Sequence, residues 1–284
     1  MPTLPPPDPA PHSERAPHQL RETAESFGSD AERYDRARPR YPQALIDRIV
    51  AAGPGPDVLD VGCGTGIAAR QFQAAGCRVL GVDVDARMAE LARQHGTDVE
   101  VASFEAWDPA GRTFDAVVSA QAWHWVDPVA GAAKAARTLR PRGLLALFWN
   151  AGRPVPDMAE AFAEIYRRVL PDSLFARLSV AQTADPYGPL CVKAADGIRK
   201  AGAFTASERW RFDWEHTYTR DEWLDQLPTQ GAFTRLPRAE LEEVLSGVGA
   251  AIDAAGGSLR MHYATVAVTA KRTDTACSPD RLIV

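Results

Sequence analysis

Residues 58–66 read VLDVGCGTG, a short apolar run that leads straight into three closely spaced glycines. Glycine at positions 62, 64 and 66 lets the backbone turn tightly and lets a ligand approach the amide groups that begin the next helix. A dinucleotide-binding loop would read GxGxxG, whereas this stretch reads GxGxG and has Ile67 at the place of the third glycine. The stretch therefore predicts a strand, a ligand-binding loop and a helix.

Two acidic residues accompany this loop. Asp60 lies inside the apolar run, and Asp83 ends the core of the next one, RVLGVDV at residues 78–84. A charge within a buried strand is costly unless it holds a ligand or backbone donors. A carboxylate at the end of the second strand can accept hydrogen bonds from both hydroxyls of a ribose. The alternative is an ordinary glycine turn with a solvated aspartate at each strand end.

Outward from the loop, apolar runs alternate with helical patterns. The runs are apolar on both faces, which is typical of parallel strands covered by helices on both sides. We expect an α/β fold, namely a Rossmann-like, doubly wound, mostly parallel seven-stranded sheet with helices on both faces. The predicted strands span residues 57–62, 78–84, 99–104, 114–120, 144–150, 208–219 and 259–272, and the main predicted helices span residues 43–53, 65–76, 85–96, 128–140, 157–170 and 238–257.

The pattern loosens after Asn150. We expect one domain over residues 21–272, with its cofactor half at about residues 27–150. Residues 151–205 hold a helix and a mixed stretch, and they predict a helical insertion placed as a lid or substrate cover. The proline-rich residues 1–20 predict a disordered N-terminus, and residues 273–284 predict a flexible tail.

Composition argues against several classes of function. The chain has 284 residues and a formal net charge of -5, which does not suit a binder of nucleic acid or of anionic membranes. It shows no run of about 18 apolar residues and no signal-peptide pattern, so we expect a soluble, cytoplasmic protein. The four cysteines form no CxxC pair, and no histidine lies at metal-ligand spacing, so we expect reduced thiols and no metal.

The stretch VLDVGCGTG, followed by VLGVDVDARM at residues 79–88, resembles the cofactor signature of class I S-adenosylmethionine-dependent methyltransferases. The resemblance implies S-adenosylmethionine as cofactor and S-adenosylhomocysteine as product. It places the glycine loop around the methionine part, Asp83 on the ribose and Met88 beside the adenine. The residues so implied in cofactor binding are Asp60, Gly62, Cys63, Gly64, Thr65, Gly66, Asp83, Val84 and Met88.

The segment ASFEAW, residues 102–107, departs from the family pattern, which often has an aspartate after the third strand to bind the adenine amine. Ser103 stands at that place, and Phe104 follows it. We therefore expect the backbone amide of Phe104 to recognise the adenine, with a weaker polar contact from Ser103. Glu105 is expected to point to solvent or to cap a turn.

The arm SFGSDAERYDRARPRYP, residues 26–42, resembles the start of a subgroup that includes trans-aconitate methyltransferase and other small-molecule enzymes. In that subgroup a tyrosine and arginines lie over the cofactor carboxylate. Tyr34 can donate a hydrogen bond and Arg38 can pair with a carboxylate bidentately, so we expect both to bind the cofactor. The alternative is a surface arm with solvated arginines.

The stretch SAQAWHWVDP, residues 119–128, follows the fourth predicted strand, at the sheet edge where open α/β sheets bind ligands. We expect Ala120 and Gln121 to border the cofactor. An Asn- or Asp-Pro-Pro-aromatic run, which is usual here in enzymes that methylate nucleic-acid bases or protein glutamine, is absent. This departure lowers the expectation of such substrates.

Three residues are expected to meet the substrate: Trp123, His124 and, on the insertion helix, Tyr166. His124 is the candidate general base, because its ordinary pKa is close to the working pH. The alternative is a structural His124 that caps the following helix or is held by a neighbouring carbonyl. Alternation along the chain indicates that Trp123 lines the pocket and that Trp125 packs in the core.

These observations predict a methyltransferase that transfers a methyl group to an oxygen, nitrogen or carbon atom of a small-molecule metabolite or natural-product intermediate. One alternative is a methyltransferase of protein or RNA, which would need a more basic or open groove. Another is a cofactor-binding homologue without catalysis. The expected partner is a small-molecule substrate rather than nucleic acid or membrane, and a homo-oligomer stays open.

Overall fold

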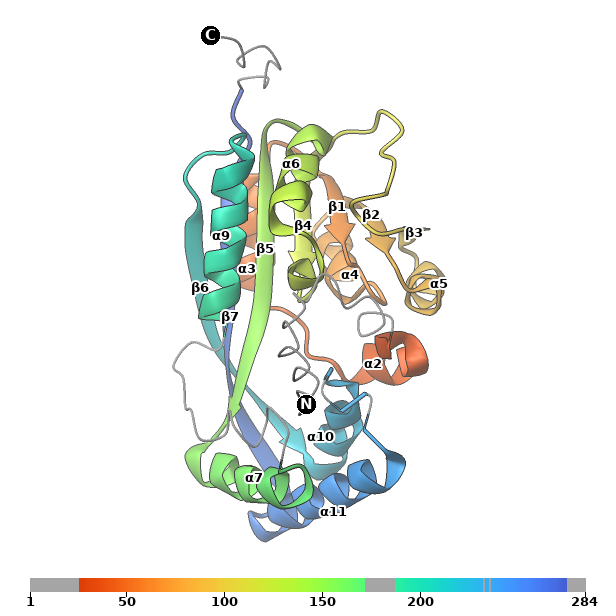
Figure 1. Cartoon of the computed structure of the whole chain (residues 1–284), viewed down its shortest axis with the longest axis vertical. Helices are drawn as coiled ribbons and strands as arrows, with labels where there is room; N and C mark the ends of the chain where they lie inside the picture. The colour runs from red at the N-terminus through yellow and green to blue at the C-terminus, as the bar shows by residue number, and fades with distance from the viewer. Residues whose placement is uncertain (1–25, 172–186, 232, 235, 275–284) are drawn as a thin grey trace, which may run out of the picture.

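The computed structural model describes residues 26–171, 187–231, 233–234 and 236–274. One seven-stranded sheet runs through it in the order β3-β2-β1-β4-β5-β7-β6 (Figure 1). Strands β1 to β5 pair in parallel, and β7 pairs antiparallel with β5 and β6. This confirms the predicted Rossmann-like, mostly parallel sheet. The strands are β1 (Asp57–Val61), β2 (Arg78–Asp83), β3 (Asp98–Val101), β4 (Phe114–Ala120), β5 (Leu139–Pro154), β6 (Glu208–Thr219) and β7 (Ser258–Lys271).

Successive side chains of the central strands enter two different cores, as a buried sheet requires. In β5, Leu147 and Trp149 pack on the face that carries helices α6 (Pro128–Thr138) and α9 (Gly188–Ala201). Phe148, between them, packs on the face that carries α3 (Gln43–Ala52) and α4 (Ile67–Ala74). Helix α5 (Ala86–Gln94) packs against β2 and β3.

A cap layer extends below the parallel strands in Figure 1. There the far ends of β5, β6 and β7 meet helices α7 (Pro156–Val169), α10 (Arg220–Gln226) and α11 (Arg238–Ala254), around a separate hydrophobic cluster. Helix α2 (Ala31–Ala37) lies between this layer and α5. The 3-10 helices are η2 (Ser26–Asp30), η3 (Trp123–Trp125) and η4 (Leu227–Thr229).

The stretch 151–205, predicted as one insertion, divides between these layers. Its first residues continue β5, and α7 joins the cap layer. Helix α9 instead returns to the sheet, where Cys191, Ala194 and Ile198 join the main core. Gly197 permits this packing, because a Cβ there would lie 2.3 Å from the backbone oxygen of Pro128 at the start of α6. The prediction that residues 151–205 form a single lid is therefore wrong for α9.

The predicted N-terminus 1–20 and most of the predicted tail 273–284 lie outside the described residues. The described part of that tail begins with Thr273, whose backbone N–H donates to the Ala203 carbonyl at 3.0 Å. None of the described helices is both long and apolar enough to cross a membrane.

A buried polar chain links the cap side of the sheet to the arm before α3. The Oγ1 hydroxyl of Thr265 donates to Asn150 Oδ1 at 2.6 Å and accepts from the Trp214 indole at 2.8 Å. Asn150 Nδ2 in turn donates to the carbonyl of Arg40 at 3.2 Å. Thr265 is fully buried, so both of its hydrogen bonds are made away from water.

Thr265→Val removes the hydroxyl at constant shape and leaves two buried partners unsatisfied. We expect the free energy of unfolding, measured by urea denaturation, to fall by about 2 kcal/mol. The control is Thr217→Val, at an exposed position on the neighbouring strand β6, which is expected to change stability by less than about 0.5 kcal/mol. Equal effects of the two variants would contradict a structural role for this chain.

Candidate active site

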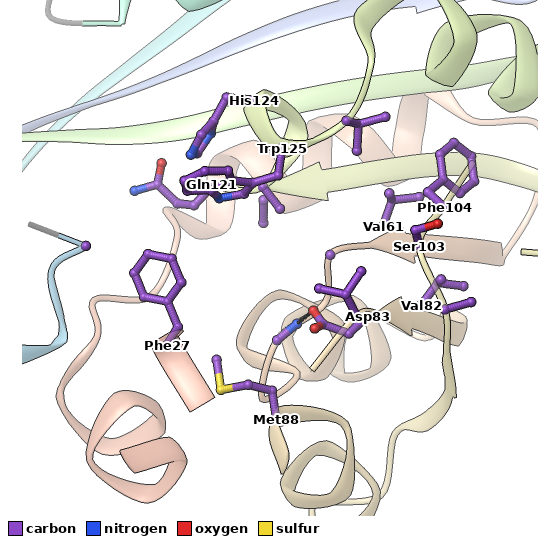
Figure 2. Close-up of a pocket in the computed structure, with 18 of the residues that line it drawn as sticks. Phe27, Val61, Val82, Asp83, Met88, Ser103, Phe104, Gln121, His124 and Trp125 are labelled. Carbon is purple, nitrogen blue, oxygen red and sulfur yellow. Dashed lines mark hydrogen bonds between the residues drawn. The ribbon is translucent and has the colours of Figure 1, made fainter. Parts of the chain in front are cut away.

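A cavity of about 570 Å³ opens at the carboxyl ends of β1, β2 and β4. This is the point of the sheet where the strand order reverses, since β1 has β2 on one side and β4 on the other. Open α/β sheets bind ligands at such points, and the volume suits a small-molecule site. Figure 2 shows its two sides, with Asp83, Ser103 and Phe104 on one and Gln121, His124 and Trp125 on the other.

The glycine loop brings bare backbone to this cavity. Gly62 and Gly64 both line it, and both hold left-handed backbone angles, with φ of +69° and +56°. A Cβ on Gly62 would lie 2.4 Å from the Cβ of Ala122. Only glycine satisfies both the angle and the contact, so the loop exposes its amides to a ligand.

Asp83 is fixed by the loop that it faces. Its Oδ2 accepts from the Gly64 backbone N–H at 2.7 Å, shown as the dashed line in Figure 2, and its Oδ1 accepts from Asp85 N–H at 2.9 Å. Burial raises the pKa of Asp83, although these backbone hydrogen bonds oppose the rise. The carboxylate thus lines the cavity in one fixed orientation, with lone pairs left for hydroxyl donors.

Asp60 lies beneath the loop and is fully buried. Neither of its carboxylate oxygens has a hydrogen-bond partner among the described residues. Burial, and then the negative charge of Asp83, raise the pKa of Asp60 to about 7. An unpaired buried carboxylate beside a second one favours a positively charged ligand nearby.

Ser103 and Phe104 line the next part of the wall, together with Val82 and Met88. Sequence reasoning missed the residue that holds this segment. Lys134 of α6 is 9% exposed, and its ammonium donates to the carbonyls of Glu105, at 2.9 Å, and Trp107. Burial lowers the pKa of Lys134. The sequence around Lys134 shows no partner for its side chain, so sequence reasoning treats this lysine as an ordinary surface residue.

Glu105 shows both behaviours expected of it. Its side chain is exposed at the rim of the cavity, and its Oε1 accepts from the backbone N–H of Asp127 at 2.9 Å. Asp127 is the N-cap of α6, so Glu105 ties this wall to the start of that helix.

The arm places Tyr34 and Arg38 on the cavity wall. The Arg38 guanidinium carbon lies 4.9 Å from the centre of the Tyr34 ring, and its charge also lowers the pKa of Tyr187 against the larger opposing effect of burial. No carboxylate in the described parts of the chain pairs with Arg38. Its positive charge therefore faces the cavity without an internal counter-ion, as a site for an anionic group requires.

The two tryptophans of η3 exchange the predicted places. Trp123 is 2% exposed and packs in the main core against Phe104, whereas Trp125 lines the cavity and contacts Phe27 edge-on. The prediction assigned the two places from alternation along the chain, whereas the two residues begin and end a single 3-10 turn, in which residues two apart point in different directions. The turn follows Gln121, whose φ of +58° redirects the chain.

His124 lines the cavity beside Gln121. Burial and the nearby charge of Lys193 lower its pKa to about 4, so the imidazole is neutral at physiological pH. Tyr166 lies elsewhere, in the cap layer, with its ring 5.7 Å from that of Phe233. The structure thus brings His124, but not Tyr166, to the cavity.

The other predicted site residues divide in the same way. The following line the cavity: Tyr34, Arg38, Gly62, Gly64, Asp83, Val84, Met88, Ser103, Phe104, Ala120, Gln121 and His124. The following do not: Asp60, Cys63, Thr65, Gly66, Trp123 and Tyr166. Phe27 and Tyr187 line it without having been predicted, and nothing in their sequence context distinguishes them.

Asp60 makes stability depend on pH in an unusual direction. The folded state keeps a proton that the unfolded chain, with a pKa of 3.8, has released, so stability falls as pH rises through about 7. Between about pH 6 and pH 8 this loss amounts to about 1.4 kcal/mol. We expect Asp60→Asn to remove this loss of unfolding free energy with rising pH, as measured by urea denaturation at several pH values. The exposed Asp98→Asn is the control, and equal pH slopes for wild type and Asp60→Asn would contradict the assignment.

Comparisons with known proteins bear on the domain that contains this cavity. Residues 59–147 match the family model described as a methyltransferase domain. An uncharacterized methyltransferase of Mycobacterium tuberculosis is 28% identical over 257 residues, which cover 88% of this chain and 97% of that protein. Malonyl-[acyl-carrier protein] O-methyltransferase of Enterobacter lignolyticus is 35% identical over 144 residues, covering 46% and 57%.

Solved structures share the fold. One from Anaeromyxobacter dehalogenans, provisionally described as a type II methyltransferase, has a TM-score of 0.60 at 24% identity and covers 84% of this chain and 99% of its own. Phosphoethanolamine N-methyltransferase 2 of Haemonchus contortus, in complex with S-adenosyl-L-methionine, has a TM-score of 0.52 at 16% identity and covers 93% and 61%. The family match thus assigns residues 59–147 to a methyltransferase domain, and the solved structures show that the chain shares the fold of methyltransferases.

Proposed function

We propose that the cavity binds S-adenosylmethionine along the glycine loop and presents its methyl group to an oxygen, nitrogen or carbon atom of a small molecule. The observation that carries this proposal is the arrangement of Asp83 with Gly62 and Gly64: an oriented carboxylate beside bare amides, at the strand reversal. Asp83 would accept from the ribose hydroxyls, and Val82, Met88 and Phe104 would flank the adenine.

The charges of the site also fit this cofactor. Asp60 and Asp83 place negative charge under the glycine loop, and Arg38 places positive charge on the arm. A bound S-adenosylmethionine would put its cationic groups toward the acids and its carboxylate toward Arg38 and Tyr34. These assignments extend the roles that the resemblance implied for the same residues.

When bound, the cofactor supplies an electrophilic methyl group on a sulfonium. The chain then has to orient the acceptor and exclude water. Phe27 and Trp125 touch edge-on at the cavity wall, with ring centres 6.4 Å apart, and Gly231 faces Phe27. This apolar cover favours a small acceptor over a protein or RNA segment. Non-catalytic cofactor binding stays as the alternative for the test below.

Relatives guide the choice of acceptors to try first. One is named a malonyl-[acyl-carrier protein] O-methyltransferase, and another a ubiquinone biosynthesis O-methyltransferase. Small acids and phenols with an oxygen nucleophile are therefore the first compounds to screen, with amines and activated carbons next. Product S-adenosylhomocysteine is the common readout, because it forms whichever atom is methylated.

Asp83→Ala tests the cofactor assignment directly. It removes the ribose acceptor and the anchor of Gly64, so we expect calorimetric binding of S-adenosylhomocysteine to weaken at least about tenfold, or about 1.4 kcal/mol. The control is Asp98→Ala, at the exposed start of β3. Unchanged binding by Asp83→Ala would overturn the proposed function.

Lys134→Met tests the part of the wall formed by Ser103 and Phe104. It leaves the carbonyls of Glu105 and Trp107 without their buried donor, so Ser103 and Phe104 should lose their fixed position. We expect S-adenosylhomocysteine to bind about three- to tenfold more weakly. Arg137→Met, exposed on the same helix, is the matched control. Thermal unfolding of both variants separates loss of the wall from loss of the fold.

A further inference from the structure

The His124 ring is held from inside the protein at one of its two nitrogens. Trp149, on β5 and 1% exposed, donates its indole N–H to His124 Nδ1 at 3.5 Å. Trp149 is itself stacked on Tyr187, with ring centres 6.3 Å apart. A neutral imidazole carries one proton, and a nitrogen that accepts a hydrogen bond does not hold it. The proton therefore lies on Nε2.

The surroundings of the ring do not favour a positive charge. Trp125 packs on the ring with centres 4.7 Å apart, and the charged neighbour that influences it is Lys193 of α9, which is also positive. Among the described residues, His95 and His262 each contact a carboxylate, Asp35 at 3.6 Å and Glu215 at 2.9 Å, whereas His124 contacts none. A general base has to become cationic, and nothing here stabilises that cation.

The neighbouring amide is already engaged. Gln121 Nε2 donates to the backbone carbonyl of Asn150 at 3.4 Å, and the Gln121 side chain also shares a hydrogen bond with the Tyr187 hydroxyl. The Nε2 of His124, in contrast, has no hydrogen-bond partner within the described parts of the chain. On this side of the cavity His124 thus offers a donor that a ligand can use.

We propose that His124 is a neutral hydrogen-bond donor to the methyl acceptor, oriented by Trp149, and not the general base. This inference rests on the proposed function. Its consequence is a constraint on the substrate: the acceptor carries a lone-pair oxygen or nitrogen beside the reacting atom, which Nε2–H binds. A proton on the reacting atom is released to water before the acceptor enters the site or after the product leaves it, because His124 does not take it.

The test is long-range ¹H–¹⁵N nuclear magnetic resonance on the full chain. His124 is assigned by loss of its signals in His124→Gln, and His262→Gln, at an exposed position, is the assignment control. We expect the Nε2–H tautomer, with nitrogen shifts constant between about pH 5.5 and pH 8. An Nδ1–H tautomer, or titration near the ordinary pKa, would overturn the proposal.

Trp149→Phe tests the positioning contact. It removes the donor to Nδ1, so we expect mixed tautomers and a pKa of His124 that rises by roughly 0.5–1 unit. An unchanged His124 signature in a folded Trp149→Phe variant would overturn the role of Trp149. If that variant does not fold, the wild-type tautomer still decides the role of His124.

Binding of S-adenosylhomocysteine to the wild-type chain separates this inference from the function on which it rests. Wild type that binds this product but shows a titrating His124 refutes the donor role alone. Wild type that does not bind it refutes the proposed function, whatever the tautomer. Once an acceptor is found, His124→Gln, which keeps a donor near the Nε2 position, should retain activity that His124→Phe loses. Equal loss in both would contradict the donor role.

Discussion

The burial of two carboxylates at the ends of adjacent parallel strands is the constraint on which the site depends. Asp83 is satisfied by the backbone N–H groups of Gly64, in the glycine loop, and of Asp85, whereas Asp60 is fully buried without a hydrogen-bond partner among the described residues. Folding thus raises the pKa of Asp60 to about 7, so that Asp60 keeps a proton below that pH and carries an unpaired negative charge above it. A buried carboxyl group with its pKa near 7 contributes little to the stability of the fold, whereas a cationic ligand bound nearby would stabilise its charged form.

The sheet can accommodate two buried carboxylates, because successive side chains of its strands form two cores that need no polar partners. Apolar runs bounded by turn residues, and the glycine spacing, are local properties, so the sequence alone predicted all seven strands, the loop and the position of Asp83. The relation of Lys134 to the wall depends on a contact between residues far apart in the chain. No local pattern signals such a contact.

The wrongly predicted positions of the η3 tryptophans and of α9 have the same cause. Trp123 and Trp125 exchange places because a 3-10 turn replaces the assumed alternation, and the left-handed angle at Gln121 starts that turn. Helix α9 packs against α6 through small residues such as Gly197, which in a sequence read as weak helix signals. In both cases tertiary packing determines the geometry, and the pattern of residue types along the chain does not predict it.

Helix α2, which carries Tyr34, is held differently from the elements that form the sheet and the cap layer. It has no buried residues; Asp35 pairs with Arg70 of α4 at 2.6 Å, and Arg33 and Arg36 attach it to Asp225 of α10 through partly exposed ion pairs. Such pairs contribute about 0–1 kcal/mol each, far less than the cores that fix the sheet and the cap layer. Helix α2 carries both Tyr34 and the start of the segment that presents Arg38, so its ion pairs, rather than a hydrophobic core, hold these two residues at the cavity.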